Sequence, residues 1–168
     1  QAFRCYEMDR ESNRARMYDY REMARYLMKQ YVGLSCEVVV LMLLDSSNRI
    51  LYCDIVSEGT AVTANIYVQK IVGLAARYQA VYAVLSHNHP SGSALPSPQD
   101  LSITSRIFDA LRDIDVLLID HIIVAGRNFT SLKESGLMPH IFTDESVNGH
   151  DCTGSRRRNV WRASVQPD

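Results

Sequence analysis

The sequence predicts a three-layer α/β/α sandwich, in which helices cover both faces of a mixed β-sheet. Apolar segments of strand length alternate with segments of helical spacing along residues 17–140. Two strand segments, 38–44 and 50–56, are joined by a short polar turn, which indicates an antiparallel hairpin and therefore a mixed sheet. With 168 residues, 46% of them apolar, the chain can bury roughly 70% of its unfolded surface in one domain.

Each expected element rests on its periodicity and on the turn residues at its ends. From Met17 to Tyr31 apolar side chains recur at three- and four-residue spacing, and Gly33 is suited to end that helix. Val38–Leu44 is apolar throughout, as a strand covered on both faces would be. In chain order we expect a helix over 17–31, strands over 38–44 and 50–56, a candidate strand at 61–65, a helix over 66–79, a strand over 80–86, a helix over 101–112, a strand over 116–125, a turn at 126–128 and a short closing helix over 132–137.

Around this core we expect two less regular segments. Residues 1–16 are rich in charge and form a short strand or an irregular arm, whereas residues 17–140 form the folded domain. Residues 141–168 are polar and aperiodic, which is typical of a flexible tail. The chain begins at Gln1 without a Met, so an upstream segment stays an open question.

Composition argues against several classes of function. The net charge of −1 gives no overall electrostatic attraction to nucleic acid or to an acidic membrane surface. The longest apolar run, 38–44, is far shorter than the roughly 20 residues that span a bilayer. The four cysteines form no C-x-x-C pair, so neither a zinc ribbon nor a disulfide framework is expected. Cys36 and Cys53 flank apolar strands and are predicted to be buried thiols, which favours a reducing, cytoplasmic compartment.

The stretch from Ser86 to Asp100 carries the strongest chemical signal. His87 and His89 stand two residues apart at a strand end, so both imidazoles can face one point in space. Together with Asp100, beyond a Pro/Gly/Ser-rich loop, they would form a three-ligand zinc site whose fourth position is open to water. Ser97-Pro98-Gln99-Asp100 is equally a competent helix start, with Ser97 as the N-cap. The two interpretations compete, because Asp100 cannot easily be both a first-turn capping residue and a zinc ligand.

A hydrolytic zinc site also needs a proton acceptor and a donor for the oxyanion. Glu37 is a candidate for the first function, because it precedes the strand 38–44, which we expect beside the strand that ends at His87. A solvated residue before a strand is the competing interpretation. The hydroxyl of Ser97 can supply the oxyanion donor.

These residues resemble a known motif. Glu37, His87-x-His89, seven intervening residues, Ser97, two more and Asp100 follow the order of the JAMM metalloenzyme motif. The run His87–Gly92 with Pro96-Ser97-Pro98 looks like the bacterial RadC-like JAB domain, and the likeness covers most of residues 17–138. Related bacterial domains commonly carry an acid where this chain has Ser93, so substrate contacts outside the zinc ligands are not implied.

The resemblance implies a cytidine-deaminase-like α/β/α fold and a zinc-dependent hydrolase of the isopeptidase type, with one Zn²⁺ per chain. By the same resemblance His87, His89 and Asp100 map to zinc ligands, Glu37 to the general acid/base and Ser97 to the oxyanion donor. The expected partner is a protein or peptide substrate, with a ubiquitin-like protein as one candidate. The resemblance also leaves open a DNA-repair-associated accessory or interaction module, although charge does not support nucleic acid. The implied fold also raises a nucleobase deaminase, which the missing H-x-E and P-C-x-x-C signatures argue against.

Overall fold

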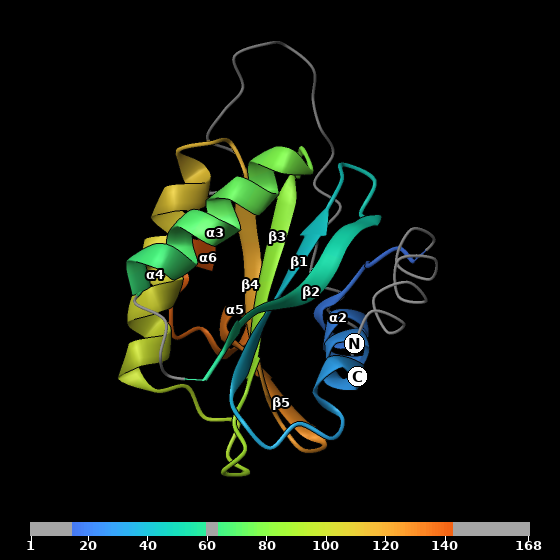
Figure 1. The fold of residues 1–168 in the computed structure, drawn as a ribbon, viewed down its shortest axis with the longest axis vertical. Helices are drawn as coiled ribbons and strands as arrows, with labels where there is room; N and C mark the ends of the chain where they lie inside the picture. The colour runs from blue at the N-terminus through green and yellow to red at the C-terminus, as the bar shows by residue number, and fades with distance from the viewer. Residues whose placement is uncertain (1–14, 60–63, 143–168) are drawn as a thin grey trace, which may run out of the picture.

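The computed structural model describes residues 15–59 and 64–142 and places a five-stranded mixed sheet between helices (Figure 1). The strand order is β2-β1-β3-β4-β5, with β3 and β4 parallel and the other neighbouring pairs antiparallel. The strands are β1 (Val38–Leu44), β2 (Ile50–Glu58), β3 (Tyr82–Asn88), β4 (Leu117–Ala125) and β5 (Asn128–Ser131). The predicted mixed α/β/α architecture is therefore confirmed.

Helices cover the two faces of the sheet unequally. Helix α2 (Tyr20–Met28) continues into the 3₁₀ turn η1 (Lys29–Tyr31) and packs on one face, whereas α3 (Ala64–Arg77) and α4 (Pro98–Arg112) cover the other (Figure 1). Two short helices, α5 (Leu132–Ser135) and α6 (Pro139–Phe142), follow β5. Because β1 and β3 are interior strands of the sheet, the residues at their ends lie away from its two edge strands.

Strand alternation divides the core into two apolar clusters. Val40, Met42 and Val84 face α2, whereas Leu41 and Leu85 face α3 and α4. Because Val39 pairs with His87 in the β1–β3 ladder, the end of β3 that carries His87 lies beside the start of β1. This pairing confirms the expected neighbourhood of the two strands.

The elements differ from the sequence-based expectations mainly at their ends. Strand β3 extends through Asn88 instead of ending at Ser86, because its ladder with β4 continues as far as the Asn88–Val124 pair. In the candidate strand at 61–65, Ala64 and Asn65 instead begin α3, and residues 61–63 lie outside the described residues. Helix α6 was not expected; it reaches Phe142 and buries Ile141, beyond the predicted domain end at residue 140. The arm up to residue 14 and the tail from residue 143 also lie outside the description.

The cysteine prediction is half wrong. Cys53 is buried in β2, but Cys36 is exposed, because it precedes β1 in a loop and is not yet covered by either helical layer. Among the described helices, none is long and apolar enough to cross a bilayer.

Candidate metal centre

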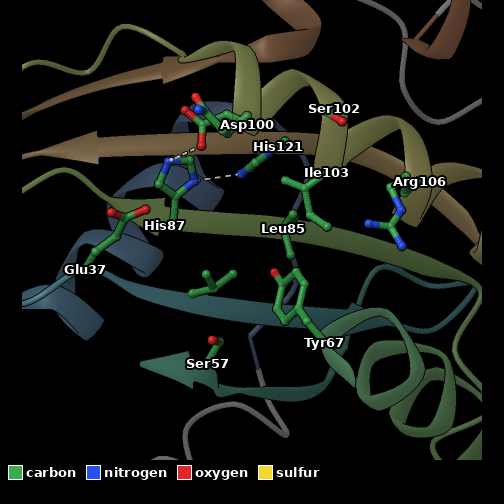
Figure 2. Close-up of a pocket in the computed structure, with 12 residues that line it drawn as sticks. Glu37, Ser57, Tyr67, Leu85, His87, Asp100, Ser102, Ile103, Arg106 and His121 are labelled. Carbon is green, nitrogen blue, oxygen red and sulfur yellow. Dashed lines mark hydrogen bonds and ion pairs between the residues drawn. The ribbon is translucent and has the colours of Figure 1, made fainter. Parts of the chain in front are cut away.

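Four side chains from three separate segments converge at one end of the sheet. His87 is the next-to-last residue of β3, His89 follows immediately after that strand, and Asp100 lies in the first turn of α4. Glu37 precedes β1 and points toward the same place (Figure 2). One potential ligand atom from each of the four lies within 4.8 Å of the others, so the structure brings together every predicted ligand and the predicted base.

The two imidazoles meet through their Nε2 atoms. The Nε2 atoms of His87 and His89 are 2.8 Å apart, and His87 Nε2 is 3.2 Å from Oδ1 of Asp100. The Nε2 atom of His89 is 3.5 Å from Oδ2 of the same carboxylate. This arrangement follows from the period of two along an extended chain, which turns residues 87 and 89 to the same side.

Asp100 is both part of a helix cap and a member of the cluster, so capping does not keep its carboxylate away from the histidines. Its Oδ2 accepts hydrogen bonds from the backbone N–H and the hydroxyl of Ser97, both at 2.7 Å, while the Ser97 Oγ accepts from the Asp100 N–H. These reciprocal contacts form a capping box. The second carboxylate oxygen, Oδ1, is turned toward His87. A carboxylate has two oxygens, and the helix start uses mainly one of them.

Electrostatics keeps Asp100 ionised. Burial by itself would raise the pKa of this carboxyl, but hydrogen bonding to His87 and to the Ser97 backbone outweighs burial and holds the pKa well below its usual range. The carboxylate is therefore available as an anionic ligand at any pH near neutrality.

Asn88 fixes the segment that carries Glu37. Its side chain points to the opposite face of β3 from the two histidines, where Oδ1 accepts from the Val38 N–H at 2.8 Å and Nδ2 donates to the Cys36 carbonyl at 3.0 Å. These two hydrogen bonds bracket Glu37 along the chain, and the Gly59 N–H donates to the Glu37 carbonyl at 2.8 Å. Although Glu37 is exposed, its backbone is thus held in place beside the cluster. We did not predict this function for Asn88; its position between two histidines on the facing side was the available signal.

The donor set fits a divalent cation. The Nδ1 atom of His89 is 2.8 Å from the Ser93 carbonyl, which can only accept, so Nδ1 carries the proton and Nε2 of the neutral ring has a lone pair. The carboxylates of Glu37 and Asp100 also accept only. At least three of the four converging groups therefore present lone pairs to a shared point, where a cation is the natural partner. Ligands ~2.1 Å from a tetrahedral ion lie about 3.4 Å apart, close to the 3.2 and 3.5 Å His–Asp separations.

Behind His87 lies a second, fully buried histidine. His121 on β4 places its Nε2 2.9 Å from Nδ1 of His87, and its own Nδ1 is 2.6 Å from Oγ1 of Thr104 on α4. Burial holds the pKa of His121 well below its ordinary value, so this imidazole is neutral. His121 and Thr104 thus form a buried hydrogen-bonded chain behind His87.

The neighbouring Asp120 belongs to a separate buried network. Burial raises the pKa of its carboxyl to about 6, even though Ser131 Oγ and the N–H groups of His121 and Lys133 donate to it. Ser131 is also the N-cap of α5, so this network joins β4 to the closing helices.

A cleft of about 440 Å³ opens beside the cluster between the sheet and α4 (Figure 2). Its floor includes the apolar side chains of Val39, Leu85 and Ile103, and one end is formed by Glu37, His87 and Asp100. The other residues that line it are Ser57, Tyr67, Gln99, Ser102, Arg106 and His121. Ser97 is not among the lining residues; its hydroxyl is directed to the Asp100 carboxylate. The cleft gives an extended ligand a route to the cluster.

Fold and site together define a class: a mixed α/β domain with a His/His/Asp/Glu candidate metal centre at the end of its central strands. Residues 17–137 match the model of the RadC-like JAB domain, and the chain belongs to that family.

Curated relatives of this domain are UPF0758 proteins. One from Shewanella baltica (strain OS185) is 40% identical over 111 residues, which cover 66% of this chain and 49% of the relative. Another, from Pseudoalteromonas translucida (strain TAC 125), is 40% identical over 113 residues, covering 67% of this chain and 50% of the relative. The chain therefore spans about half the length of the curated relatives it matches.

Proposed function

We propose that this domain is a zinc-dependent metallopeptidase of the isopeptidase type, which hydrolyses a peptide or isopeptide bond. The observation that carries the proposal is the convergence of His87, His89, Asp100 and Glu37 within 4.8 Å at the mouth of a cleft. In this proposal the two imidazoles and Asp100 hold one Zn²⁺. A zinc ion held by three protein ligands supplies a water of lowered pKa and polarises a substrate carbonyl.

Glu37 acts as the general acid/base in this scheme. Its carboxylate lies at the cluster without a rigid side-chain hydrogen bond among the described contacts, and its backbone is fixed by the contacts around it. A carboxylate on a fixed backbone can accept a proton from the attacking water and return it to the leaving amine. The exposure of Glu37 is consistent with a group that must reach both solvent and substrate.

Ser97 is proposed to donate to the oxyanion. In the present arrangement its hydroxyl donates to Oδ2 of Asp100 at 2.7 Å. To serve the oxyanion, the hydroxyl must rotate away from that carboxylate, while the backbone N–H of Ser97 keeps its own 2.7 Å bond to Oδ2. The capping box therefore stays partly closed when the hydroxyl moves.

The proposed partner is a protein or peptide whose chain lies along the cleft, with a ubiquitin-like protein as one candidate. The apolar floor suits an extended chain better than a highly charged ligand. A cytoplasmic location is part of the proposal, because a reducing compartment keeps the exposed thiol of Cys36 free.

Metal content and peptide cleavage test this proposal together. We would purify wild type, His89→Ala, Glu37→Ala and the control His140→Ala, which alters an exposed histidine on α6. We expect about one equivalent of zinc in wild type, Glu37→Ala and His140→Ala, and a large loss in His89→Ala. Cleavage of a mixed peptide and isopeptide library, followed by mass spectrometry, should disappear in Glu37→Ala and persist in His140→Ala.

The outcomes separate the parts of the proposal. Loss of zinc from Glu37→Ala would make Glu37 a ligand and not the base. Zinc-loaded wild type that cleaves nothing in the library would refute the peptidase function and leave a metal-binding interaction module.

A further inference from the structure

We propose that Tyr67 is a substrate-binding residue of the cleft, and that its hydroxyl donates a hydrogen bond to a main-chain carbonyl of a bound peptide. The inference rests on the proposed function for the class of substrate, because it takes a peptide to be what occupies the cleft. It uses neither the metal nor the cleavage step, so the two proposals can fail separately.

The hydroxyl of Tyr67 has no hydrogen-bond partner within the protein. Tyr67 lies on α3, is 6% exposed and lines the cleft. Among the residues that the structure describes, its oxygen is the one buried side-chain nitrogen or oxygen atom without a hydrogen bond. Since native proteins pair nearly all such atoms, an unpaired one beside a cleft points to a ligand that supplies the partner.

Tyr31 shows how a structural tyrosine is accommodated in this fold. It is 8% exposed in the apolar cluster on the other face of the sheet, and its hydroxyl donates to Oγ of Ser86 at 2.8 Å. Ser86 in turn donates to the Ile122 carbonyl at 2.7 Å. The fold therefore supplies a partner for the hydroxyl of one buried tyrosine and none for that of the other.

The hydroxyl of Tyr67 does not stabilise the free protein. A buried hydroxyl that loses its hydrogen bonds with water and gains none costs free energy of folding, and phenylalanine would fill nearly the same space without that cost. Water is a poor partner here, because a buried water needs two or more polar neighbours, whereas Val39 and Leu85, which line the cleft with Tyr67, are apolar. The hydroxyl therefore suits a ligand better than the free fold.

The position of Tyr67 relative to the metal centre determines which part of a substrate it contacts. Figure 2 shows the ring reaching from α3 into the cleft, with the hydroxyl at its end nearer His87. Leu85, which also lines the cleft, precedes His87 by two residues on β3, a spacing of roughly 7 Å along the strand. An extended peptide advances by a similar distance over two residues, so a chain with one bond at the centre places a carbonyl two or three residues away beside Tyr67.

The chemistry of this hydroxyl favours a neutral acceptor. Burial raises the pKa of Tyr67 well above its ordinary value, so the hydroxyl keeps its proton and can donate it to a hydrogen bond. A carboxylate would lose its hydration in this apolar part of the cleft, whereas an amide carbonyl carries no charge and recurs at each residue of a peptide. Because the oxygen is covered in the free protein, the ring turns when a peptide binds, as side chains at interfaces commonly do.

The stability of the free protein gives the first test. Tyr67→Phe should leave the urea midpoint of unfolding unchanged or raise it, whereas Tyr31→Phe should lower it, because only Tyr31 loses a hydrogen bond. Tyr78→Phe is the control, since it removes the hydroxyl of a tyrosine that does not line the cleft. If Tyr67→Phe lowers the midpoint as much as Tyr31→Phe, or does not fold, the hydroxyl has a structural function and the inference is wrong.

Binding of blocked peptides gives the second test. The probe is a library of acetylated and amidated hexapeptides, offered in buffer with zinc to Glu37→Ala, which in the proposed function cannot cleave them. For the peptides that are retained, adding Tyr67→Phe to this variant should weaken binding about 3–10-fold, and adding Tyr78→Phe should leave it unchanged. Replacing one peptide carbonyl oxygen by sulfur, a weaker acceptor, should weaken binding at a single position when Tyr67 is present and have no such effect with Tyr67→Phe.

The binding results decide the inference whichever way they fall. Equal affinity for every retained peptide with and without Tyr67→Phe refutes it, and so does a library from which no peptide is retained. Failure of the proposed function gives a different result: peptides whose binding depends on Tyr67 but which zinc-loaded wild type never cleaves would refute the peptidase and leave the binding site in place.

Discussion

Replacing Asp100 by asparagine separates its two functions, because the cap needs one acceptor oxygen and the metal centre needs a negative charge. In Asp100→Asn the amide oxygen can still accept from the Ser97 N–H, the bond that measures 2.7 Å in the native protein. The amide nitrogen then takes the position of Oδ1, 3.2 Å from Nε2 of His87, where it offers neither a negative charge nor an acceptor. Asparagine therefore keeps the acceptor of the cap and removes the acceptor that faces His87.

The magnitudes follow from these contacts. Asp100→Ala removes the acceptor of the capping box and should cost about 1 kcal/mol of unfolding free energy. Asp100→Asn keeps that acceptor, so without metal it should be more stable than Asp100→Ala. With zinc at 100 times the dissociation constant, the unfolding free energy of wild type should rise by about 2.7 kcal/mol, and that of both variants should rise far less.

Urea unfolding at pH 8, with a chelator and with added zinc, measures these differences. Asp109→Asn is the matched control, since Asp109 lies on the same helix, is exposed, and uses its side chain in a 3.4 Å ion pair with Arg112. The control should stay within about 0.5 kcal/mol of wild type under both conditions. If Asp100→Asn is as unstable as Asp100→Ala in the presence of chelator, our account of the separate functions of the two carboxylate oxygens is wrong.

Two further predictions concern groups outside the centre. Because burial raises the pKa of Asp120 to about 6 from 3.8, the folded state binds this proton more tightly, and the stability it contributes is lost as pH rises through 6. Relative to Asp120→Asn, the unfolding free energy of wild type should therefore rise by roughly 1.3 kcal/mol when the pH is lowered from 7 to 5. Carbon NMR should show the Asp120 carboxyl titrating near pH 6, and a midpoint near pH 4 would contradict the assignment. Thiol labelling of the native protein, mapped by mass spectrometry, should modify exposed Cys36 quickly and Cys53 only on unfolding, because burial raises the pKa of the Cys53 thiol. Equal labelling of both would show that β2 opens readily.

The local elements could be predicted because their causes are local. The apolar run Val38–Leu44 and the turn after it determine a hairpin whatever the rest of the chain does, and β1 has the expected ends. The same holds for His87 and His89, since the period of an extended chain by itself turns both rings to one side. The candidate ligands could accordingly be predicted from residue types and spacing.

The exposure of Cys36 and the two simultaneous contacts of Asp100 could not be predicted from local patterns. Cys36 has apolar neighbours in sequence and looks like a buried thiol, but its exposure depends on where the helical layers end. For Asp100 the sequence predicted either a helix cap or a metal ligand. In the structure α4 is oriented against β3 so that one carboxylate oxygen faces the helix start and the other faces His87.

What the sequence by itself determined is therefore the order of elements, the mixed sheet and the set of candidate metal-binding side chains, because each follows from periodicity or from residue chemistry over a few positions. Tertiary structure alone decided that Glu37 is held beside the histidines by Asn88, and that Thr104 and His121 stand behind His87. These contacts join residues at least 17 positions apart, and one of them joins residues 50 positions apart. They therefore depend on strand order and helix packing. No local pattern encodes the distance between such groups.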